Sequence, residues 1–309
     1  MSAATRSPKG SNPRPRLRIV SLLPSATEIL FGIGAGEEVV GVTHECDYPA
    51  EALGLPKLTC ASTGGGTTSA EIDRHVRAAV HAGSSLYHLD SALLARLDPD
   101  LIVTQELCAV CAVSYEIVDS AAKRLRSDPR VISLEPACVQ DVLANITQLG
   151  EITGHSAEAR DLVAQLESRI TALRTRTAAR AERPRTLVLE WTDPPMSAGH
   201  WIPELVELAG GIPVLANPGA NSRRLDWAAI AAAAPEAVIV APCGFDLVKT
   251  RRAIDELGAV DTWRSLVGQL AGRVLGLDGN AYLSRPGPRL VDAAEIIERW
   301  YTSGAEYAG

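Results

Sequence analysis

The chain lacks both the long apolar run of a membrane-spanning segment and the basic surplus of a nucleic-acid-binding protein. No apolar stretch in its 309 residues approaches the roughly 20 residues that cross a bilayer. The formal net charge is −7, whereas nucleic acid is bound by a concentrated basic face. With 46% hydrophobic residues, the chain is long enough to build two packed lobes. We therefore predict a globular protein whose partner is a small molecule and not a nucleic acid.

The sequence also lacks the usual motifs of common enzymes. It contains no Gly-x-Ser-x-Gly elbow and no Ser-His-Asp spacing, so no ordinary hydrolase is indicated and no catalytic residue is predicted. The run Gly64-Gly65-Gly66 lacks the lysine of a phosphate-binding loop and is predicted to be a flexible connection. These absences favour a binding protein over an enzyme.

The amino-terminal segment shows no apolar core of a secretory signal. Residues 1–16 are rich in Ser, Pro, Arg and Lys, whereas such a signal needs an apolar run of roughly 7–15 residues. We therefore expect a disordered leader over residues 1–16 and a cytoplasmic location. On that expectation a membrane permease of the ABC type is a doubtful partner, and the six cysteines should be free thiols.

Short β-branched runs alternate with helical patterns along the chain, which is typical of an α/β fold with parallel sheets. Residues 17–22, 39–42 and 101–104 read as buried strands, and the rhythm restarts after Pro184. Residues 157–182 contain neither Gly nor Pro and carry leucines at helical spacing, which predicts one long helix. The predicted domains are an N-terminal α/β lobe over 17–155, a linking helix over 156–183 and a C-terminal α/β lobe over 184–309.

A capping-box pattern, Ser25-Ala-Thr-Glu28, predicts the start of the first helix with Ser25 as its N-cap.

Two loops carry most of the chemically reactive side chains. His44, Glu45 and Cys46 follow the strand at 39–42, and Glu106, Cys108 and Cys111 follow the strand at 101–104. In an open α/β sheet, ligands bind beyond the carboxyl ends of the strands. If these two strands are neighbours, His44, Cys46, Cys108 and Cys111 could form one zinc or iron–sulfur site. The alternatives are a redox-active Cys-x-x-Cys pair and buried, inert thiols.

Several motifs resemble those of the helical-backbone substrate-binding proteins that serve cobalamin and iron–siderophore transporters. The motifs lie at 19–30 (Ile-Val-Ser-Leu-Leu-Pro-Ser-Ala-Thr-Glu-Ile-Leu), 40–43, 47–49, 99–103, 191–199 and 285–289. The opening motif is the most specific, and the cobalamin-binding branch is the most similar. The resemblance implies two Rossmann-like α/β lobes joined by a single long helix, with a ligand clamped in the cleft between them and little hinge motion.

The resemblance also implies a set of residues that face the ligand. The candidates are Pro24, Ser25, Glu45 and Glu106 in the first lobe and Trp191, His200, Trp201, Tyr282 and Arg285 in the second. The aromatic rings would offer flat walls to a macrocycle, and Arg285 could meet an anionic group or cap a loop. His200 could ligate a corrinoid cobalt, or simply bond to backbone at the start of a helix.

Two functions follow from these observations. The first is a protein that binds cobalamin or a related metal chelate between two lobes, without enzymatic activity. The second is a cytoplasmic metalloprotein or redox protein with a zinc or iron–sulfur centre at His44, Cys46, Cys108 and Cys111.

Overall fold

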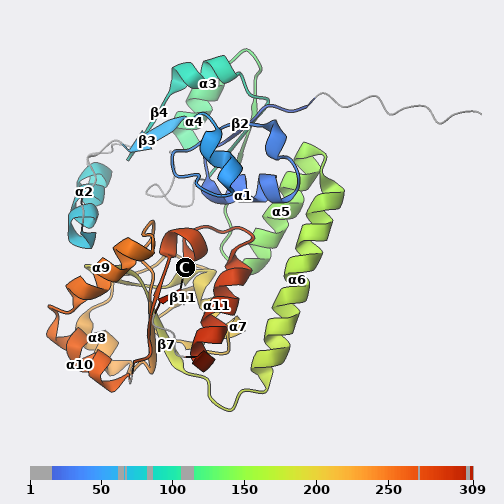
Figure 1. The fold of residues 1–309 in the computed structure, drawn as a ribbon. Coiled ribbons are helices and arrows are strands. Elements are labelled where there is room, and N and C mark those ends of the chain that lie inside the picture. The colour runs from blue at the N-terminus through green and yellow to red at the C-terminus, as the bar shows by residue number, and fades with distance from the viewer. Residues whose placement is uncertain are drawn as a thin grey trace, which may run out of the picture.

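The computed structural model describes residues 16–61, 66, 68–81, 86–105, 115–270, 272–303 and 307–308. Two α/β lobes lie one beyond the other, and a long helix, α6, runs alongside both (Figure 1). The predicted fold class is therefore confirmed. The predicted leader over 1–16 lies outside the described residues except for its last residue, and so do Glu106, Cys108 and Cys111.

The first lobe is built on a parallel sheet in the order β2-β1-β5-β6. Its strands are β1 (Ile19–Ser21), β2 (Val39–Val42), β5 (Leu101–Thr104) and β6 (Arg130–Ser133). A separate antiparallel ribbon joins β3 (Thr59–Ala61) to β4 (Tyr87–Leu89). This ribbon is not predictable from the sequence, because its three-residue strands carry no periodic signal.

Helices cover both faces of this sheet. They are α1 (Pro24–Gly32), α3 (Ser91–Leu97), α4 (Tyr115–Ala122) and α5 (Val139–Thr153), with 3₁₀ turns at Gly36–Glu38 and Ala50–Gly54; helix α2 (Ser69–His81) lies apart from this sheet (Figure 1). Alternate residues of β1 divide between the two faces, because side chains along a strand point in opposite directions. Ile19 joins the core formed with α1 and α5, whereas Val20 packs with residues of α3 and α4.

The predicted N-cap at Ser25 is wrong. Helix α1 already begins at Pro24, and its N-cap position is Leu23, which makes no side-chain cap. The Ser25 hydroxyl oxygen is buried without a hydrogen-bond partner, and Glu28 turns away from the helix start toward two arginines. A proline at the first helical position supplies the start signal here, since its missing N–H needs no cap.

Helix α6 (Ser156–Ala178) confirms the predicted single connecting helix. It packs against α5 of the first lobe and against α7 and α11 of the second. Its buried side carries Leu166, Ile170 and Leu173, which belong to one apolar core extending through both lobes. The helix ends four residues before the predicted position. Beyond its end, Arg180 donates to the carbonyl oxygens of Ala209 and Glu298, so tertiary contacts end the helix.

The second lobe repeats the α/β plan. Its sheet runs β10-β7-β12-β13-β14, with β8 antiparallel on β7. The strands are β7 (Arg185–Thr192), β8 (Pro195–Ser197), β10 (Ile212–Pro213), β12 (Ala237–Val240), β13 (Val274–Leu277) and β14 (Tyr307–Ala308), and β9 (Gly199–His200) pairs with β11 (Asn217–Pro218). The helices are α7 (Ile202–Leu208), α8 (Trp227–Ala232), α9 (Leu247–Leu257), α10 (Asp261–Gln269) and α11 (Leu290–Ser303), with a π-helical turn at Gly279–Leu283.

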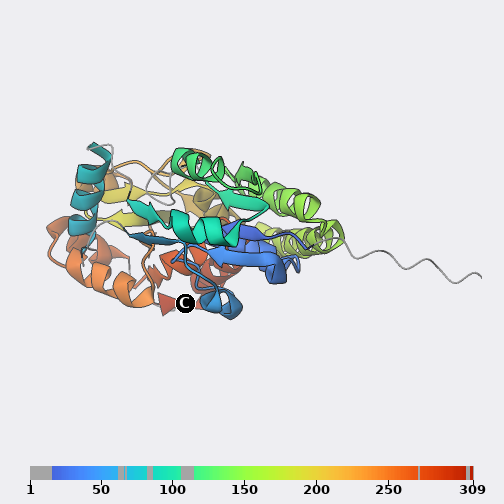
Figure 2. The same ribbon diagram turned by 90° about the horizontal axis from the view of Figure 1, so that it is seen from above.

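Helix α2 lies within the first-lobe part of the sequence but packs against the second lobe. Seen from above, it stands beside the second lobe, at the end of the molecule opposite α5 and α6 (Figure 2). It contacts β7 of the second lobe. No helix in the described part of the chain is long and apolar enough to cross a membrane.

The contact between α5 and α6 gives a test of the fold. A Cβ added at Gly150 would overlap the Cβ of Ala159, whereas a Cβ added at the exposed Gly268 of α10 would meet nothing within 4 Å. We expect Gly150→Ala to lower the free energy of unfolding by about 1–3 kcal/mol, because the two helices must move apart. Gly268→Ala should raise it by up to about 1 kcal/mol through helix propensity. Urea unfolding measures both, and equal effects would contradict the close packing.

Candidate functional site

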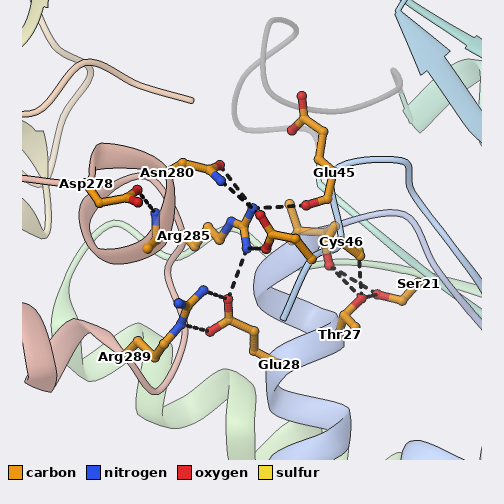
Figure 3. A network of polar contacts seen from close by, with 12 residues as sticks. Ser21, Thr27, Glu28, Glu45, Cys46, Asp278, Asn280, Arg285 and Arg289 are labelled. Carbon is orange, nitrogen blue, oxygen red and sulfur yellow. Dashed lines mark hydrogen bonds and ion pairs between the residues drawn. The ribbon is translucent and has the colours of Figure 1, made fainter. Parts of the chain in front are cut away.

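A polar seam joins the two lobes at the carboxyl end of the first sheet (Figure 3). The loop after β2 meets the segment between β13 and α11. Arg285 donates to the carbonyl oxygen of Glu45 at 2.9 Å and to a carboxylate oxygen of Asp47. Asn280 donates to the other carboxylate oxygen of Asp47 at 3.2 Å and accepts a hydrogen bond from Arg285 at 3.0 Å. These contacts tie the loop to the second lobe.

A buried carboxylate lies at the centre of this seam. Glu28 of α1 accepts two hydrogen bonds from Arg289, one from Nε at 3.0 Å and one from Nη2. The Nη1 of Arg285 lies 3.5 Å from Glu28 Oε1. The side chain of Glu28 is 2% exposed and that of Arg285 is 4% exposed. Glu28 therefore fastens the first helix of one lobe to the start of the last helix of the other.

The charges in the seam balance, because two carboxylates face two guanidinium groups. Burial acts to raise the pKa of Asp47, but the hydrogen bond from Arg285 and the charges of Arg285 and Arg289 outweigh it and hold this pKa below its usual value. Asp47 therefore stabilises the fold fully above the unfolded-state pKa of about 3.9. This contribution is lost as the pH falls through the lower, folded-state value.

Three residues predicted to contact the ligand are instead buried in the seam. Pro24 and Ser25 are buried in the first turn of α1, and a Cβ added at Gly287 of the second lobe would stand 3.6 Å from the Cβ of Ser25. Arg285 uses both terminal nitrogens on protein partners. These three expectations are corrected: Pro24, Ser25 and Arg285 are buried and offer almost no surface to a ligand, and Arg285 joins the two lobes.

His44 and Glu45 do offer partly exposed side chains beside the seam, with exposed fractions of 30% and 40%. The Nδ1 of His44 lies 2.7 Å from the hydroxyl oxygen of Thr59 in β3. The carboxylate of Glu45 accepts a hydrogen bond from the Tyr87 hydroxyl at 3.4 Å, and the rings of His44 and Tyr87 lie 5.7 Å apart. The β3–β4 ribbon thus supports the two side chains that the sequence analysis placed at the strand end.

Cys46 points into the core and not toward His44. Its side chain is 1% exposed and lies 3.0 Å from the Thr27 hydroxyl. Burial raises the pKa of this thiol to about 11, although the hydrogen bond with Thr27 and the charges of Lys57 and Arg285 act to lower it. A thiol with that pKa stays protonated near neutral pH, whereas a metal needs the thiolate.

The predicted joint metal site is therefore not assembled among the described residues. Strand β1 lies between β2 and β5, so the strands before the two cysteine-bearing loops are not neighbours. A turn closed by the Cys46 N–H on the Thr43 carbonyl oxygen directs His44 and Cys46 to different sides. The described part of the chain holds no cluster of three His, Cys, Asp or Glu residues suited to a metal ion. Cys108 and Cys111 lie outside it, and the zinc or iron–sulfur alternative gains no support.

The predicted aromatic walls of the second lobe divide into two groups. Trp201 is 6% exposed and donates to the Leu283 carbonyl oxygen at 2.9 Å, so it belongs to the core and the expectation of a ligand contact is corrected. Trp191 and Tyr282 are half-buried, and Trp191 lies edge-on to Phe245. His200 is also half-buried, with Nε2 2.9 Å from the Asn221 side-chain oxygen, in a backbone conformation at φ 47° that disfavours most side chains.

Helix α2 makes a second connection between the lobes. The Ser69 hydroxyl lies 2.7 Å from that of Thr192, and the Ser69 carbonyl oxygen accepts from the Trp191 indole at 3.2 Å. Asp73 pairs with Arg224 of the second lobe at 2.9 Å. A cavity of about 380 Å³ lies here; its lining is Ala70, Asp73, Arg74, Arg77, Asp193, Pro194 and Arg224. Asp73 pairs with Arg77 as well as with Arg224, but the three arginines outnumber the two aspartates of the lining, and this excess of positive charge suits an anionic group.

The fastening between the lobes, formed by Glu28, Asp47 and Arg289, was not predicted from the sequence. A signal was available, because these residues lie within the motifs at 19–30, 47–49 and 285–289. Thr59 and Tyr87 gave no signal, since their roles arise only when the β3–β4 ribbon pairs.

Comparisons with known proteins agree with this architecture. A family described as "Periplasmic binding protein" matches residues 19–281. A vitamin B12-binding protein of Vibrio cholerae is 22% identical, covering 93% of this chain and 90% of that protein. One from Yersinia pestis is 23% identical over 91% of this chain and 84% of its own length.

Solved structures show the same fold. The periplasmic vitamin B12-binding protein of Vibrio cholerae gives a TM-score of 0.67 at 19% identity, covering 94% of this chain and 98% of that one. A periplasmic haem-binding protein from Roseiflexus gives 0.70 at 23% identity, covering 94% and 100%. The resemblance inferred from the motifs is confirmed. The predicted cytoplasmic location is wrong, because the matching family and these relatives are periplasmic binding proteins and point to a periplasmic location.

The buried seam predicts a large effect of one substitution. Glu28→Ala would leave Arg285 and Arg289 without their shared carboxylate, and removing one partner of a buried ion pair costs about 3–5 kcal/mol. The matched control is Glu182→Ala, which breaks an exposed pair with Arg273 at 3.9 Å. We expect the control to unfold at the parent urea concentration. A Glu28 variant that unfolded there too would refute the role of the seam.

Thiol reactivity tests the placement of Cys46. Cys60 and Cys243 are exposed, whereas Cys46 is buried with its pKa raised to about 11. Brief iodoacetamide treatment at pH 8 should label the two exposed cysteines and leave Cys46 unmodified until the protein is unfolded, because only thiolates react. Peptide mass spectrometry reads out each site. Early labelling of Cys46 would mean that the loop after β2 is open.

Proposed function

The chain belongs to the periplasmic binding protein family, and from that membership we propose that it binds a corrinoid, cobalamin or a close relative, between its two lobes. Family members are solute-binding components of transport and not enzymes, so the chain is a ligand-binding protein. The observation that carries the corrinoid assignment is the similarity to vitamin B12-binding proteins, which extends over 93% of the chain and so includes both lobes.

The geometry of the seam supports a ligand held beside it. His44 and Glu45 lie beyond the carboxyl end of β2, where α/β sheets bind their ligands. Half-buried Trp191 and Tyr282 of the second lobe add flat apolar surface, and the arginines near α2 add positive charge. A corrinoid combines a broad apolar ring with amide groups and, in cobalamin, one phosphate. Ring walls, polar side chains and a cationic patch match these three features.

The proposal extends to location and delivery. We infer that the protein acts in the periplasm and passes its ligand to an ABC transporter permease. Family members work with such permeases, and this inference replaces the earlier expectation that a permease is a doubtful partner.

Ligand titration of the purified protein tests the assignment. We expect 1:1 binding of cyanocobalamin by calorimetry. Trp191→Ala should weaken it about 10-fold, equivalent to roughly 1.4 kcal/mol, because an aromatic wall is lost. Trp227→Ala is the matched control: Trp227 is also a half-buried tryptophan of the second lobe, but it packs on Trp263, in the helix α10.

Three results would count against the proposal. The first is binding of haem without binding of any corrinoid. The second is equal weakening of corrinoid binding by both tryptophan variants, provided that circular dichroism shows both to be folded. The third is stoichiometric zinc or iron in the protein as purified, together with no affinity for corrinoids.

A further inference from the structure

The two nitrogens of the His44 imidazole have different surroundings. Nδ1 lies 2.7 Å from the Thr59 hydroxyl oxygen, whereas the nearest charged group to Nε2, the Glu45 carboxylate, stands 4.0 Å away. Thr59 is 6% exposed, so its hydroxyl is a fixed partner with little competition from water. The ring is therefore oriented from within the protein, while the His44 side chain as a whole is 30% exposed.

The hydrogen bonds of the Thr59 hydroxyl bear on which nitrogen of His44 carries the proton. Its hydroxyl oxygen accepts from the His44 backbone N–H at 3.1 Å and lies 2.7 Å from the Thr43 hydroxyl oxygen. A hydroxyl has one proton to donate and two acceptor positions. When Thr59 donates to Thr43, its second acceptor position receives the Nδ1–H of His44. Nε2 is then left unprotonated, with its lone pair available.

We propose that Nε2 of His44 is an axial ligand to the metal of the bound corrinoid, with Thr59 as the residue that positions it. The inference rests on the proposed function and adds the residue that recognises the metal. Imidazole nitrogen is a common ligand of transition metals, and a ligating histidine typically donates its other N–H to a fixed acceptor. In the tautomer with its proton on Nδ1, Thr59 is that acceptor.

The position of the loop supports this assignment. Glu45, the next residue, is tied to the second lobe through Arg285, and Asp47 is tied to it through Asn280. His44 therefore lies beside the seam, in the part of the loop that cannot drift away from the second lobe. Tyr87 stands against the imidazole and, through its hydroxyl, holds the Glu45 carboxylate.

The chemical step is a ligand exchange at cobalt(III). The bond from cobalt to its bound water breaks, the Nε2 lone pair forms the new bond, and the water leaves. The oxidation state does not change, and Nδ1 keeps its proton on Thr59. A corrinoid whose exchangeable position is filled by cyanide cannot react in this way with a neutral imidazole.

A comparison of two ligands tests the inference. We expect the parent protein to bind aquocobalamin at least about 10-fold more tightly than cyanocobalamin, a difference on the scale of one metal-site interaction. The absorption spectrum of bound aquocobalamin should shift to that of an imidazole complex. His44→Ala and His44→Gln should abolish both the preference and the shift while still binding cyanocobalamin; the Gln variant keeps a polar contact for Thr59.

Two Thr59 variants separate positioning from packing. Thr59→Val removes the acceptor at nearly constant volume and should lower the aquocobalamin preference about 10-fold, whereas Thr59→Ser keeps the hydroxyl and should retain the preference. Equal binding of both corrinoids by the parent protein, without a spectral shift, would overturn the inference and leave the proposed function standing. Failure to bind either corrinoid would overturn both.

Discussion

The buried carboxylate of Glu28 constrains how the two lobes can sit. It lies on the first helix, and its partner Arg289 lies 261 positions later, at the start of the last helix. A buried charge is strongly destabilising unless it is paired. Separating the lobes here would break the ion pairs of Glu28 and leave buried charges without partners. Helix α6 connects the lobes along one side, and the ion network adds a second attachment. The relation between the lobes is thus set before any ligand arrives.

That constraint explains why several predicted ligand residues are not available to a ligand. The sequence indicates that Ser25, Trp201 and Arg285 matter, because Ser25 and Arg285 lie in distinctive motifs and Trp201 follows one closely. Their roles depend on partners far away in the chain. Ser25 is buried against Gly287 of the second lobe, Arg285 bonds to the loop after β2, and Trp201 donates to the backbone of Leu283. A motif gives the position of an important residue, but only the tertiary contacts decide whether it binds a ligand or another part of the protein.

The parts of the fold that could be predicted are those whose signals are local. Runs of β-branched residues identify β1, β2, β5 and β12, and the uninterrupted helical pattern identifies α6. Strand order is not local, and it places β1 between β2 and β5, the two strands whose adjacency a joint metal site required. The β3–β4 ribbon and the docking of α2 on the second lobe are equally invisible in the sequence, since they arise from pairing between distant segments.

The loop after β2 shows why neighbouring reactive residues need not form one site. In an extended strand, His44 and Cys46 would share a face, because side chains alternate with a period of two. The turn between Thr43 and Cys46 breaks this alternation, and each residue finds its own surroundings. Cys46 enters the apolar core, where burial keeps its thiol protonated. The backbone carbonyl oxygen of Glu45 accepts a hydrogen bond from Arg285, and the imidazole of His44 is oriented by the Thr59 hydroxyl. One short segment therefore contributes to the core through Cys46, to the seam between the lobes through Glu45 and to the surface beside the seam through His44.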